Sequence, residues 1–291
     1  MVQPCERGVR LEDLLCDRFR SLSKMYLREV VKNGSCEVNG RHENIGYRLR
    51  PNDFIEIELD LTREHSMLPQ DIPLEIIHED ADLIVVVKPT GMLVHPSHRE
   101  KKGTLLNALV FHFNRNGGPM VRPGLVHRLD RETSGLMVVA KNPRAHRILC
   151  RQFQGRSVEK LYVALVDGEV LADAGIIEGN IGRHADQKIW GLKDEGKPSL
   201  TRFRVLRREQ GSTLLELEPV TGRTNQLRIH CASIGHPIVG DTHRGGRQFR
   251  RLCLHAARLG FRELTGGNLL SFVSEEDFSE PSLGREAVHR T

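Results

Sequence analysis

Predicted strands follow one another in groups along the second half of the chain. Residues 199–206 and 213–217 alternate in polarity around a turn at 210–211, as the two arms of a hairpin do, and residues 255–261 and 269–272 are two further strand segments. Such grouping, without strict alternation of strands and helices, favours an α+β domain with a mixed, mostly antiparallel sheet. A doubly wound nucleotide-binding fold is disfavoured, because neither a Gly-x-Gly-x-x-Gly nor a Walker-type loop is present.

Three segments predict strands, and two predicted helices lie between them. One helix carries an apolar face from Leu105 to Phe113 after a Thr104 cap. Asn142-Pro143 opens the other, with proline in the first turn, where its missing N–H is tolerated. Residues 83–87 and 136–140 predict buried strands, and residues 160–166, which alternate weakly in polarity, predict a third strand. Residues 176–198 are polar and contain several glycines, so we expect an exposed excursion there.

The first 60 residues form a pattern of their own. Apolar residues recur at helical spacing over residues 11–19. A second helix is predicted from a serine cap at Ser21 or Ser23 to a left-handed stop at Asn33-Gly34. Two short strands are predicted after it, at residues 36–38 and 54–59.

A chain of 291 residues is long enough for two domains. Residues 61–73 lack periodicity and contain two prolines, which is typical of a linker. We therefore expect a small α+β module over residues 1–60, a linker over 61–73, a larger domain over 74–273 and a frayed tail over 274–291.

A row of basic residues marks the second predicted helix. Arg20, Lys24, Arg28 and Lys32 recur every fourth residue, so they share one helical face, and no acidic residue lies within the row. A solvated surface is one interpretation of this face. Contact with a phosphate backbone is the other, since it would relieve the repulsion among like charges. The formal net charge of +5 favours a polyanionic partner without establishing one.

The densest polar cluster of the larger domain is Gly-Leu-Val-His-Arg-Leu-Asp-Arg-Glu-Thr-Ser-Gly, residues 124–135. Apolar residues lead into it, and the predicted strand 136–140 leads out of it. Loops with this content, held by apolar segments on both sides, are where folds tend to place chemistry. A salt-bridged, solvated turn has the same composition, so the cluster alone leaves both interpretations open.

Part of this cluster resembles the signature of a known enzyme family. The order His127-Arg128-Leu129-Asp130-x-x-Thr133-Ser134-Gly135 is similar to that of the RluA-type RNA pseudouridine synthases. Three further segments resemble family elements in the expected order, namely Lys160-x-Tyr162, Gly222-Arg223-Thr224-x-Gln226-Leu227-Arg228-x-His230 and Leu254-His255-Ala256.

The chain departs from the family pattern in three places. Val87 stands where asparagine usually precedes Lys88-Pro89, Asn225 replaces a histidine, and the His-Pro pair usual after Leu254-His255-Ala256 is missing. Residues 8–60 in turn resemble the small RNA-binding module named after ribosomal protein S-four.

The resemblance implies a pseudouridine synthase fold and the isomerisation of uridine in RNA without a cofactor or a metal. Asp130 is then the essential carboxylate beside the ribose, with Arg228 close to it. Tyr162 stacks on the flipped base, its phenol being also a catalytic candidate for removal of the C5 proton, and Arg128 takes the position that the base vacates. The other residues expected to contact RNA are Lys88, Lys141, Arg131, Arg223, Arg20, Lys24, Arg28 and Lys32. Because the N-terminal module accompanies many members that modify large-subunit rRNA, we expect rRNA rather than tRNA as the substrate.

Two other functions use the same residue types. A hydrolase of glycosidic bonds needs a second carboxylate, for which Asp241 is the candidate. A non-catalytic RNA-binding protein on the same fold would not need Asp130. His127 and His230 are expected to make structural hydrogen bonds in either case.

The six cysteines include no Cys-x-x-Cys pair and match no zinc-ligand spacing, so no metal site is predicted. Acidic residues among the first twenty argue against a signal peptide, and no apolar run is long enough to span a membrane. We expect a reduced, cytoplasmic, monomeric protein.

Overall fold

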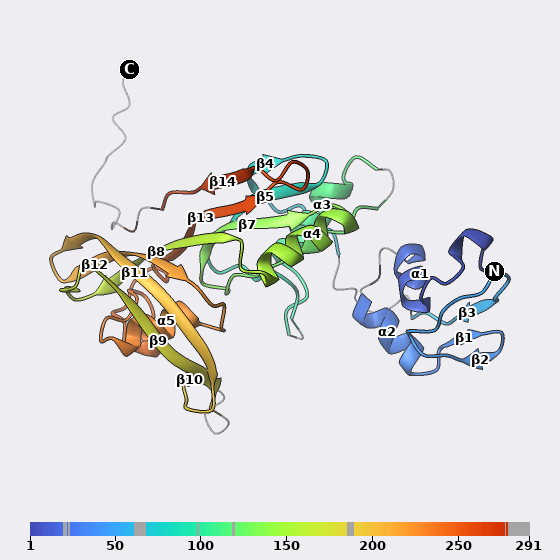
Figure 1. Cartoon of the computed structure of the whole chain (residues 1–291), viewed down its shortest axis with the longest axis horizontal. Helices are drawn as coiled ribbons and strands as arrows, with labels where there is room; N and C mark the ends of the chain where they lie inside the picture. Colours follow the sequence, from blue (N-terminus) through green and yellow to red (C-terminus); the bar gives the residue numbers. More distant parts are fainter. Residues whose placement is uncertain are drawn as a thin grey trace, which may run out of the picture. The chain divides into compact units, whose positions relative to one another are not determined.

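A computed structural model describes residues 1–19, 22, 24–60, 68–97, 99–117, 120–184, 189–276 and 278 (Figure 1). The chain divides into two compact units. The first comprises Met1–Ile84, Met92–Arg128 and Val138–Arg147, and the second comprises Val85–Gly91, Leu129–Met137 and Ile148–Thr291. The predicted domain borders at residues 60 and 74 do not separate these units, and the expected two-domain division stays a prediction.

The N-terminal part of the first unit is a small α+β module with a core of its own. Its elements are η1 (Pro4–Glu6), α1 (Leu11–Arg18), α2 (Lys24–Lys32), β1 (Cys36–Val38), β2 (Arg41–His42) and β3 (Ile55–Ile57). The strands form an antiparallel sheet in the order β2-β1-β3. Leu11, Leu15, Leu27, Val30 and Cys36 are buried together. Both predicted helices and both predicted strands are confirmed, the second strand being shorter than expected.

The rest of the first unit places two helices as the sequence predicts. Its elements include β4 (Glu75–Glu79), the start of β5 (Leu83–Lys88), α3 (Leu105–Asn114), β6 (Gly124–Leu125), the end of β7 (Ser134–Ala140) and the start of α4 (Pro143–Gln154). The Thr104 hydroxyl caps α3 by accepting the Asn107 N–H. Asn142 likewise accepts the Ala145 N–H at 2.9 Å in the first turn of α4. The Asn107 amide also donates to the Leu68 carbonyl, so part of the predicted linker is fixed to α3.

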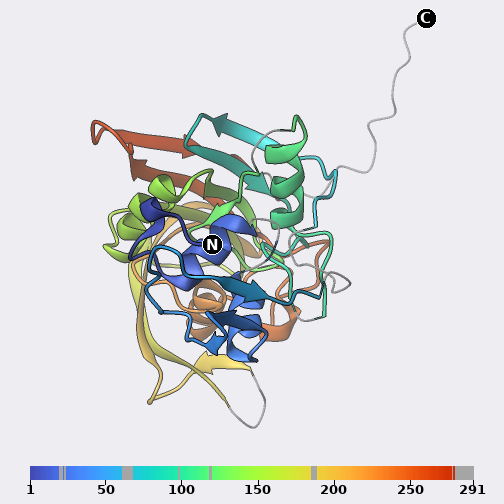
Figure 2. The same cartoon turned by 90° about the vertical axis from the view of Figure 1, so that its right-hand side faces the viewer.

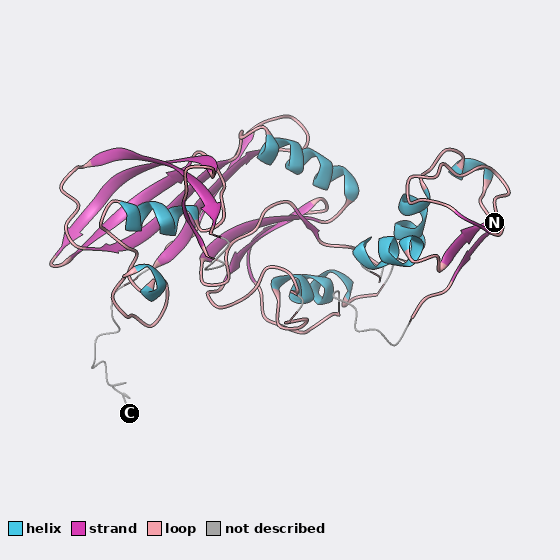
Figure 3. Cartoon of the chain, turned by 90° about the horizontal axis from the view of Figure 1, so that it is seen from below, coloured by secondary structure: helices cyan, strands magenta, loops and turns pink. Residues whose placement is uncertain are grey.

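Eleven strands of the described residues form one mixed sheet, in the order β10-β9-β11-β12-β8-β13-β7-β5-β4, with β14 beside β13 and β6 beside β7 (Figure 3). The second unit contributes β8 (Glu159–Asp167), β9 (Ala174–Arg183), β10 (Trp190–Leu192), β11 (Lys197–Glu209), β12 (Ser212–Pro219), β13 (Leu254–Arg262) and β14 (Leu269–Val273). Neighbouring strands from β10 to β13 pair antiparallel, whereas β13 pairs parallel with β7. The predicted α+β fold with a mostly antiparallel sheet is confirmed.

The expected exposed excursion over residues 176–198 is wrong, because this segment contains most of β9, all of β10 and the start of β11. Its glycines hid the strands from sequence reasoning. A Cβ at Gly179 would lie 2.7 Å from the Leu192 side chain, and one at Gly175, directly before the segment, would lie 2.6 Å from the Phe203 ring. Large neighbours thus cover the glycine positions, so the apolar alternation of a strand is missing from the sequence.

Helix α5 (Gln226–Ser233) lies against the sheet beside β9, β10, β11 and β12 (Figure 1). Leu227 and Cys231 of the helix join a buried cluster with Leu215 and Leu217 of β12. Burial of such side chains contributes about 1.5–3 kcal/mol each. The cluster therefore fixes the helix that carries most of the Gly222–His230 segment. Within the described ranges, no helix combines the length and apolar content needed to cross a membrane.

The register of three neighbouring strands determines where the polar cluster lies. Gly135 of β7 is opposite Ala256 of β13, and Ala256 is opposite Tyr162 of β8. β13 continues into the hairpin with β14, which Figure 2 shows in orange and red. Gly135 has φ +118°, and a Cβ there would lie 2.4 Å from the Ala256 nitrogen. Only glycine permits this approach, which fixes the end of the segment that begins at Asp130.

We predict that Gly135→Ala lowers the free energy of unfolding by at least about 3 kcal/mol, because the new methyl group would collide with backbone atoms. Gly211→Ala is the matched control, since Gly211 also has a positive φ (+77°) but no atom within 4 Å of its hypothetical Cβ. The control should lose only about 1–2 kcal/mol. Chemical denaturation of both variants measures the difference, and equal losses would contradict the proposed close contact.

Candidate active site

A tight turn at Asp130–Thr133 is fixed by the last residue of β5 and the segment that follows it. The Thr133 N–H donates to the Asp130 carbonyl at 3.2 Å, which closes the turn. The Lys88 ammonium donates to the Arg131 carbonyl at 3.0 Å, and the Thr90 hydroxyl donates to the Glu132 carbonyl at 2.8 Å. Two successive carbonyls of the turn are thus held from one side, which fixes the backbone that carries Asp130.

The expectation that Lys88 contacts phosphate is wrong. Its side chain is fully buried, and its ammonium also donates to the Pro89 carbonyl at 2.7 Å. Burial lowers the pKa of Lys88 to about 8, while the negative charges of Glu132 and Asp130 oppose that shift. Lys88 is therefore a positioning residue beneath the turn. The sequence motif revealed the residue type but not the direction of its side chain.

Asp130 is partly exposed, and its charge acts on several ionisable groups around it. Burial and, after it, the charge of Asp130 raise the pKa of the Tyr162 phenol. The same carboxylate favours the charged forms of Lys88, Arg228 and Arg244. The structure thus gathers one carboxylate, one neutral phenol and three cationic side chains in the second unit.

Arg228 forms its ion pair with Asp241 rather than with Asp130. Its Nε and Nη2 donate to the two oxygens of Asp241 at 2.7 and 2.6 Å, in the bidentate geometry that suits a guanidinium. This hydrogen bonding raises the pKa of Arg228, against the effect of burial. The predicted proximity to Asp130 holds only as an electrostatic attraction, because the hydrogen bonds described for Arg228 go to Asp241 and Asn225.

Asn225, which replaces the histidine usual in the family, has two structural roles here. It lies at the N-terminal cap of α5 in the left-handed conformation (φ 54°), which asparagine adopts more readily than most residues. Its side-chain oxygen accepts a hydrogen bond from Nη1 of Arg228 at 3.3 Å. With asparagine at this position, Arg228 therefore has two hydrogen-bonding partners, Asp241 and Asn225.

The rest of the Gly222–His230 segment is fastened by buried hydrogen bonds. The Gln226 amide accepts from the Arg223 N–H and donates to the Leu200 carbonyl. His230 is fully buried between two hydroxyls, with Nε2 2.8 Å from Ser199 Oγ and Nδ1 2.9 Å from Thr201 Oγ1. Burial lowers the pKa of His230 to about 4, so the ring is neutral at physiological pH. Its predicted structural role agrees with this geometry.

His127 likewise makes a structural contact, because its Nε2 accepts the Val138 N–H at 3.1 Å. The two arginines on either side of Leu129 and Asp130 are exposed, namely Arg128 and Arg131. Both remain candidates for contact with RNA.

The other two predicted RNA contacts differ from each other. Arg223 is partly exposed, and its Nε donates to the Pro198 carbonyl at 3.1 Å. Lys141 is half-buried, and its ammonium lies 2.8 Å from Glu79 Oε1 and 2.7 Å from the Asp80 carbonyl. A lysine already paired in this way is a poor phosphate ligand, so the structure favours Arg223 over Lys141.

Sequence reasoning missed two groups near the turn. Arg244 of η2 (Thr242–Arg244) is influenced by the charges of Asp241 and Asp130. The sequence feature that could have revealed Arg244 is its place between an aspartate and a pair of glycines, in Gly240-Asp241-Thr242-His243-Arg244-Gly245-Gly246.

The second missed group anchors the far end of the turn. Arg251 donates to the Ser134 hydroxyl, His255 Nδ1 lies 2.7 Å from the same oxygen, and Glu276 pairs with Arg251 at 3.1 Å. No signal in the sequence linked residues so far apart. Across the described residues, no group of three or more His, Cys, Asp or Glu side chains is arranged to hold a metal ion.

The basic face of α2 is partly neutralised from the preceding helix. Glu12 of α1 forms ion pairs with both Lys24, at 3.2 Å, and Arg28. The expectation of an unpaired row is therefore wrong, because it considered only residues within the row. Arg20, Ser21 and Ser23 lie outside the described residues.

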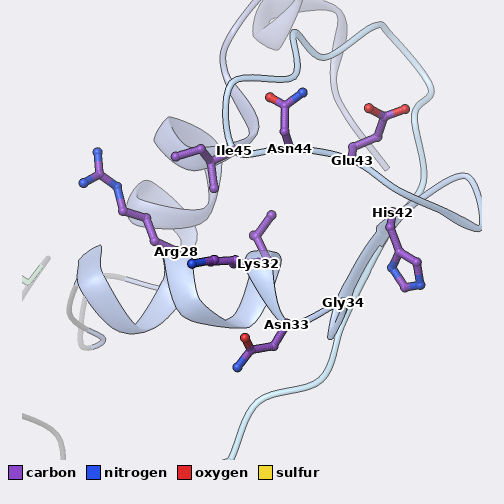
Figure 4. Close-up of a pocket in the computed structure, with 9 residues that line it drawn as sticks. Arg28, Lys32, Asn33, Gly34, His42, Glu43, Asn44 and Ile45 are labelled. Atoms are coloured by element: carbon purple, nitrogen blue, oxygen red, sulfur yellow. The ribbon is translucent and has the colours of Figure 1, made fainter.

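Arg28 and Lys32 also line a pocket of about 820 Å³ between the end of α2 and the chain after β2 (Figure 4). Its other lining residues are Val31, Asn33, Gly34, His42, Glu43, Asn44 and Ile45. The lining thus combines the basic Arg28 and Lys32 with the acidic Glu43 and the apolar Val31 and Ile45.

Comparison with known proteins establishes the family. Residues 82–233 match the RNA pseudouridylate synthase family. An uncharacterized RNA pseudouridine synthase of Aquifex aeolicus is 41% identical over 284 residues, which span 92% of this chain and 90% of that protein. Ribosomal large subunit pseudouridine synthase D of Pseudomonas aeruginosa is 40% identical over 247 residues, 82% of this chain and 75% of that protein.

A solved structure of a human protein supports the same family assignment. Human RNA pseudouridylate synthase domain containing 1 superposes with a TM-score of 0.59 and 30% identity, covering 70% of this chain and 84% of that one. The chain belongs to the RNA pseudouridine synthase family, among its RluA-type members. It is an RNA pseudouridine synthase, an isomerase that acts on uridine in RNA.

We predict that burial of His230 makes the protein less stable in acid. The folded-state pKa of about 4 lies below the ordinary value of 6.5, so the unfolded chain binds more protons between these values. The free energy of unfolding should therefore fall by about 3 kcal/mol as the pH drops from about 6.5 to 4. Denaturant unfolding at several pH values measures this, with His230→Asn losing that component and the exposed His243→Asn retaining it. Identical pH profiles for His230→Asn and the wild type would contradict the assignment.

Proposed function

We propose that this enzyme isomerises uridine to pseudouridine in large-subunit ribosomal RNA, with Asp130 as the essential carboxylate, and that it acts in the cytoplasm. The observation that carries the proposal is the strand register that brings the Asp130 turn and Tyr162 to one site. The names of two relatives, from Pseudomonas aeruginosa and Zymomonas mobilis, support the choice of rRNA, since each is called a ribosomal large subunit pseudouridine synthase.

The reaction accounts for the residues of the site. The bond between C1′ and N1 breaks, the freed uracil rotates, and C1′ joins C5. The C5 proton leaves and N1 takes up a proton, so product and substrate are isomers. A carboxylate beside the ribose serves this sequence by adding to C1′, by stabilising positive charge at C1′, or by removing the C2′ proton. All three routes use an ionised Asp130, and a turn fixed by Lys88 and Thr90 holds it in one position.

Tyr162 and Arg128 have complementary roles in this proposal. The target base must leave its stack at the expense of a few kcal/mol before its ribose reaches Asp130. Exposed Arg128 then occupies the vacated position in the RNA. Tyr162 offers a flat face to the rotating uracil, and its raised pKa supports a neutral phenol that stacks rather than a phenolate that acts as a base.

The geometry disfavours the hydrolase alternative. A glycosidic-bond hydrolase of that kind needs a second carboxylate that exchanges a proton with the leaving group or with water. The Asp241 side chain is fully buried, and both of its oxygens accept hydrogen bonds from Arg228. It therefore serves as an anchor for a cation and not as an acid or a base.

The N-terminal module is proposed to bind the same RNA outside the active site. Within its basic face, Glu12 offsets Lys24 and Arg28, so Lys32 and the pocket it lines supply the strongest site for a phosphate. A resemblance of residues 8–60 to the RNA-binding module of ribosomal protein S-four supports this role.

We predict that Asp130→Asn abolishes pseudouridine formation, with single-turnover rates reduced on the order of 10⁴-fold, because the amide carries no negative charge. Its affinity for an rRNA transcript should stay close to that of the wild type. Glu132→Gln, which removes an exposed carboxylate from the same turn, is the control and should retain most of the activity. Mapping of pseudouridine in the transcript is the assay, and substantial product from Asp130→Asn would remove Asp130 from its proposed role.

We also predict that Lys32→Gln weakens RNA binding and flattens its dependence on salt. Loss of one phosphate contact lowers the slope of log K against log salt concentration by about 1. Arg18→Gln is the control, since Arg18 is an exposed arginine of the same module that pairs with Glu6 at 2.8 Å. If both variants keep the wild-type slope in a salt titration, the module does not contact phosphate through this face.

A further inference from the structure

Arg244 presents a buried N–H group that no group in the described residues satisfies. Its Nη2 donates to the Trp190 carbonyl of β10 at 3.0 Å. Its Nε is buried and lacks a hydrogen-bond partner, while the nearest carboxylate oxygen, Oδ2 of Asp241, is 3.8 Å away. That distance is too long for a hydrogen bond. An unsatisfied buried donor is uncommon in a folded protein and calls for an explanation.

The neighbouring carboxylate is already in use. Both oxygens of Asp241 accept hydrogen bonds from Arg228, so two guanidinium groups share one carboxylate. Burial and the charge of Arg228 lower the pKa of Arg244, whereas Asp241 and Asp130 oppose this shift. Arginine nevertheless stays protonated in proteins. The site therefore holds a second cation, which is attracted by the charge of Asp130 and whose Nε–H group makes no hydrogen bond to any described residue.

The backbone around Arg244 is held in place by packing. The Arg244 and Gly246 N–H groups both donate to the Asp241 carbonyl, at 2.9 and 3.0 Å. A Cβ at Gly246 would lie 2.2 Å from the Ile238 carbonyl, so the loop closes tightly on the residues before it. With Nη2 held by Trp190 as well, the guanidinium is fixed before any substrate binds.

The proposed reaction needs a donor of this kind. When the bond between C1′ and N1 breaks, its electron pair stays on the uracil ring, and the negative charge spreads over N1 and the two carbonyl oxygens. Three of the N–H groups of Arg228 are already committed to Asp241 and Asn225. A preorganised cationic donor beside the leaving base would stabilise the charge as it develops.

We propose that Arg244 is a uracil-binding residue: its side chain is 17% exposed, and its accessible N–H groups donate to the carbonyl oxygens of the extruded base and stabilise its negative charge during cleavage. The inference rests on the proposed function of Asp130. A backbone phosphate of the same nucleotide is the alternative ligand. Because only 17% of the Arg244 side chain is exposed, the base, which enters the site, is favoured over a phosphate, which stays with the RNA strand.

The test measures affinity and single-turnover rate separately, using the full-length protein and a large-subunit rRNA transcript that the wild type modifies. Arg244→Gln should lower the rate about 10²-fold while the dissociation constant stays unchanged. Arg244→Lys should recover part of the rate, because it restores the charge without the planar fork. Arg247→Gln is the control, since Arg247 is an exposed arginine of the same loop that pairs with Asp167 at 3.3 Å.

A second substrate separates charge stabilisation from a purely structural role. Fluorine at C5 makes the uracil anion more stable, so a transcript with 5-fluorouridine at the target position depends less on Arg244. The rate loss in Arg244→Gln, measured as consumption of the target nucleotide, should shrink at least several-fold with this substrate. If Arg244→Gln does not fold, the same comparison is made with Arg244→Lys.

Several results would overturn the inference. A weaker affinity with an unchanged rate would make Arg244 a phosphate contact, and equal rate losses on both substrates would make its role structural. If wild type is active, Asp130→Asn is inactive and Arg244→Gln reacts at the wild-type rate, this inference alone fails. A wild-type protein that forms no pseudouridine in any rRNA or tRNA transcript would overturn the proposed function and the inference together.

Discussion

The close approach of Gly135 to Ala256 is the constraint on which the site depends. It lets β7 pair in parallel with β13 at the point where the polar turn ends. β13 in turn pairs with β8, where Tyr162 lies opposite Ala256. Any side chain at residue 135 would separate these strands. Because successive side chains of a strand point to opposite faces of the sheet, a shift of the register by one residue would turn every side chain to the other face. The fold thus specifies the position of Asp130 through backbone contacts.

Three cations, the buried Lys88 and the half-buried Arg228 and Arg244, feel the charge of Asp130, and each is stabilised by a different kind of partner. Lys88 donates to main-chain carbonyls, Arg228 donates to both oxygens of Asp241, and Arg244 donates to the Trp190 carbonyl while its Nε–H makes no hydrogen bond within the described part of the chain. Burying a charge without partners is strongly unfavourable, which explains why the first two are so fully hydrogen-bonded. The incomplete bonding of the third is what sets Arg244 apart.

Much of the fold was predictable from the sequence, because periodicity identified most strands. Motif order proposed Asp130, Tyr162 and Arg228 as site residues, and their roles stay a prediction. Directions of side chains were not predictable. Lys88 points into the protein, and Arg228 pairs with an aspartate 13 residues away. Partners contributed by other elements were missed for the same reason, as with Glu12 beside α2. The glycine-rich strand β9 was not predicted, because the apolar side chains that lie over its glycines belong to Phe203 of β11 and Leu192 of β10.

The most direct measurement is a crystal structure of Asp130→Asn bound to an rRNA fragment that contains the target uridine. The account predicts an extruded nucleotide with its C1′ beside residue 130 and its uracil stacked on Tyr162. A target uridine that remains stacked in the RNA, or one that binds away from Tyr162, would contradict the central claim that this strand register builds the active site.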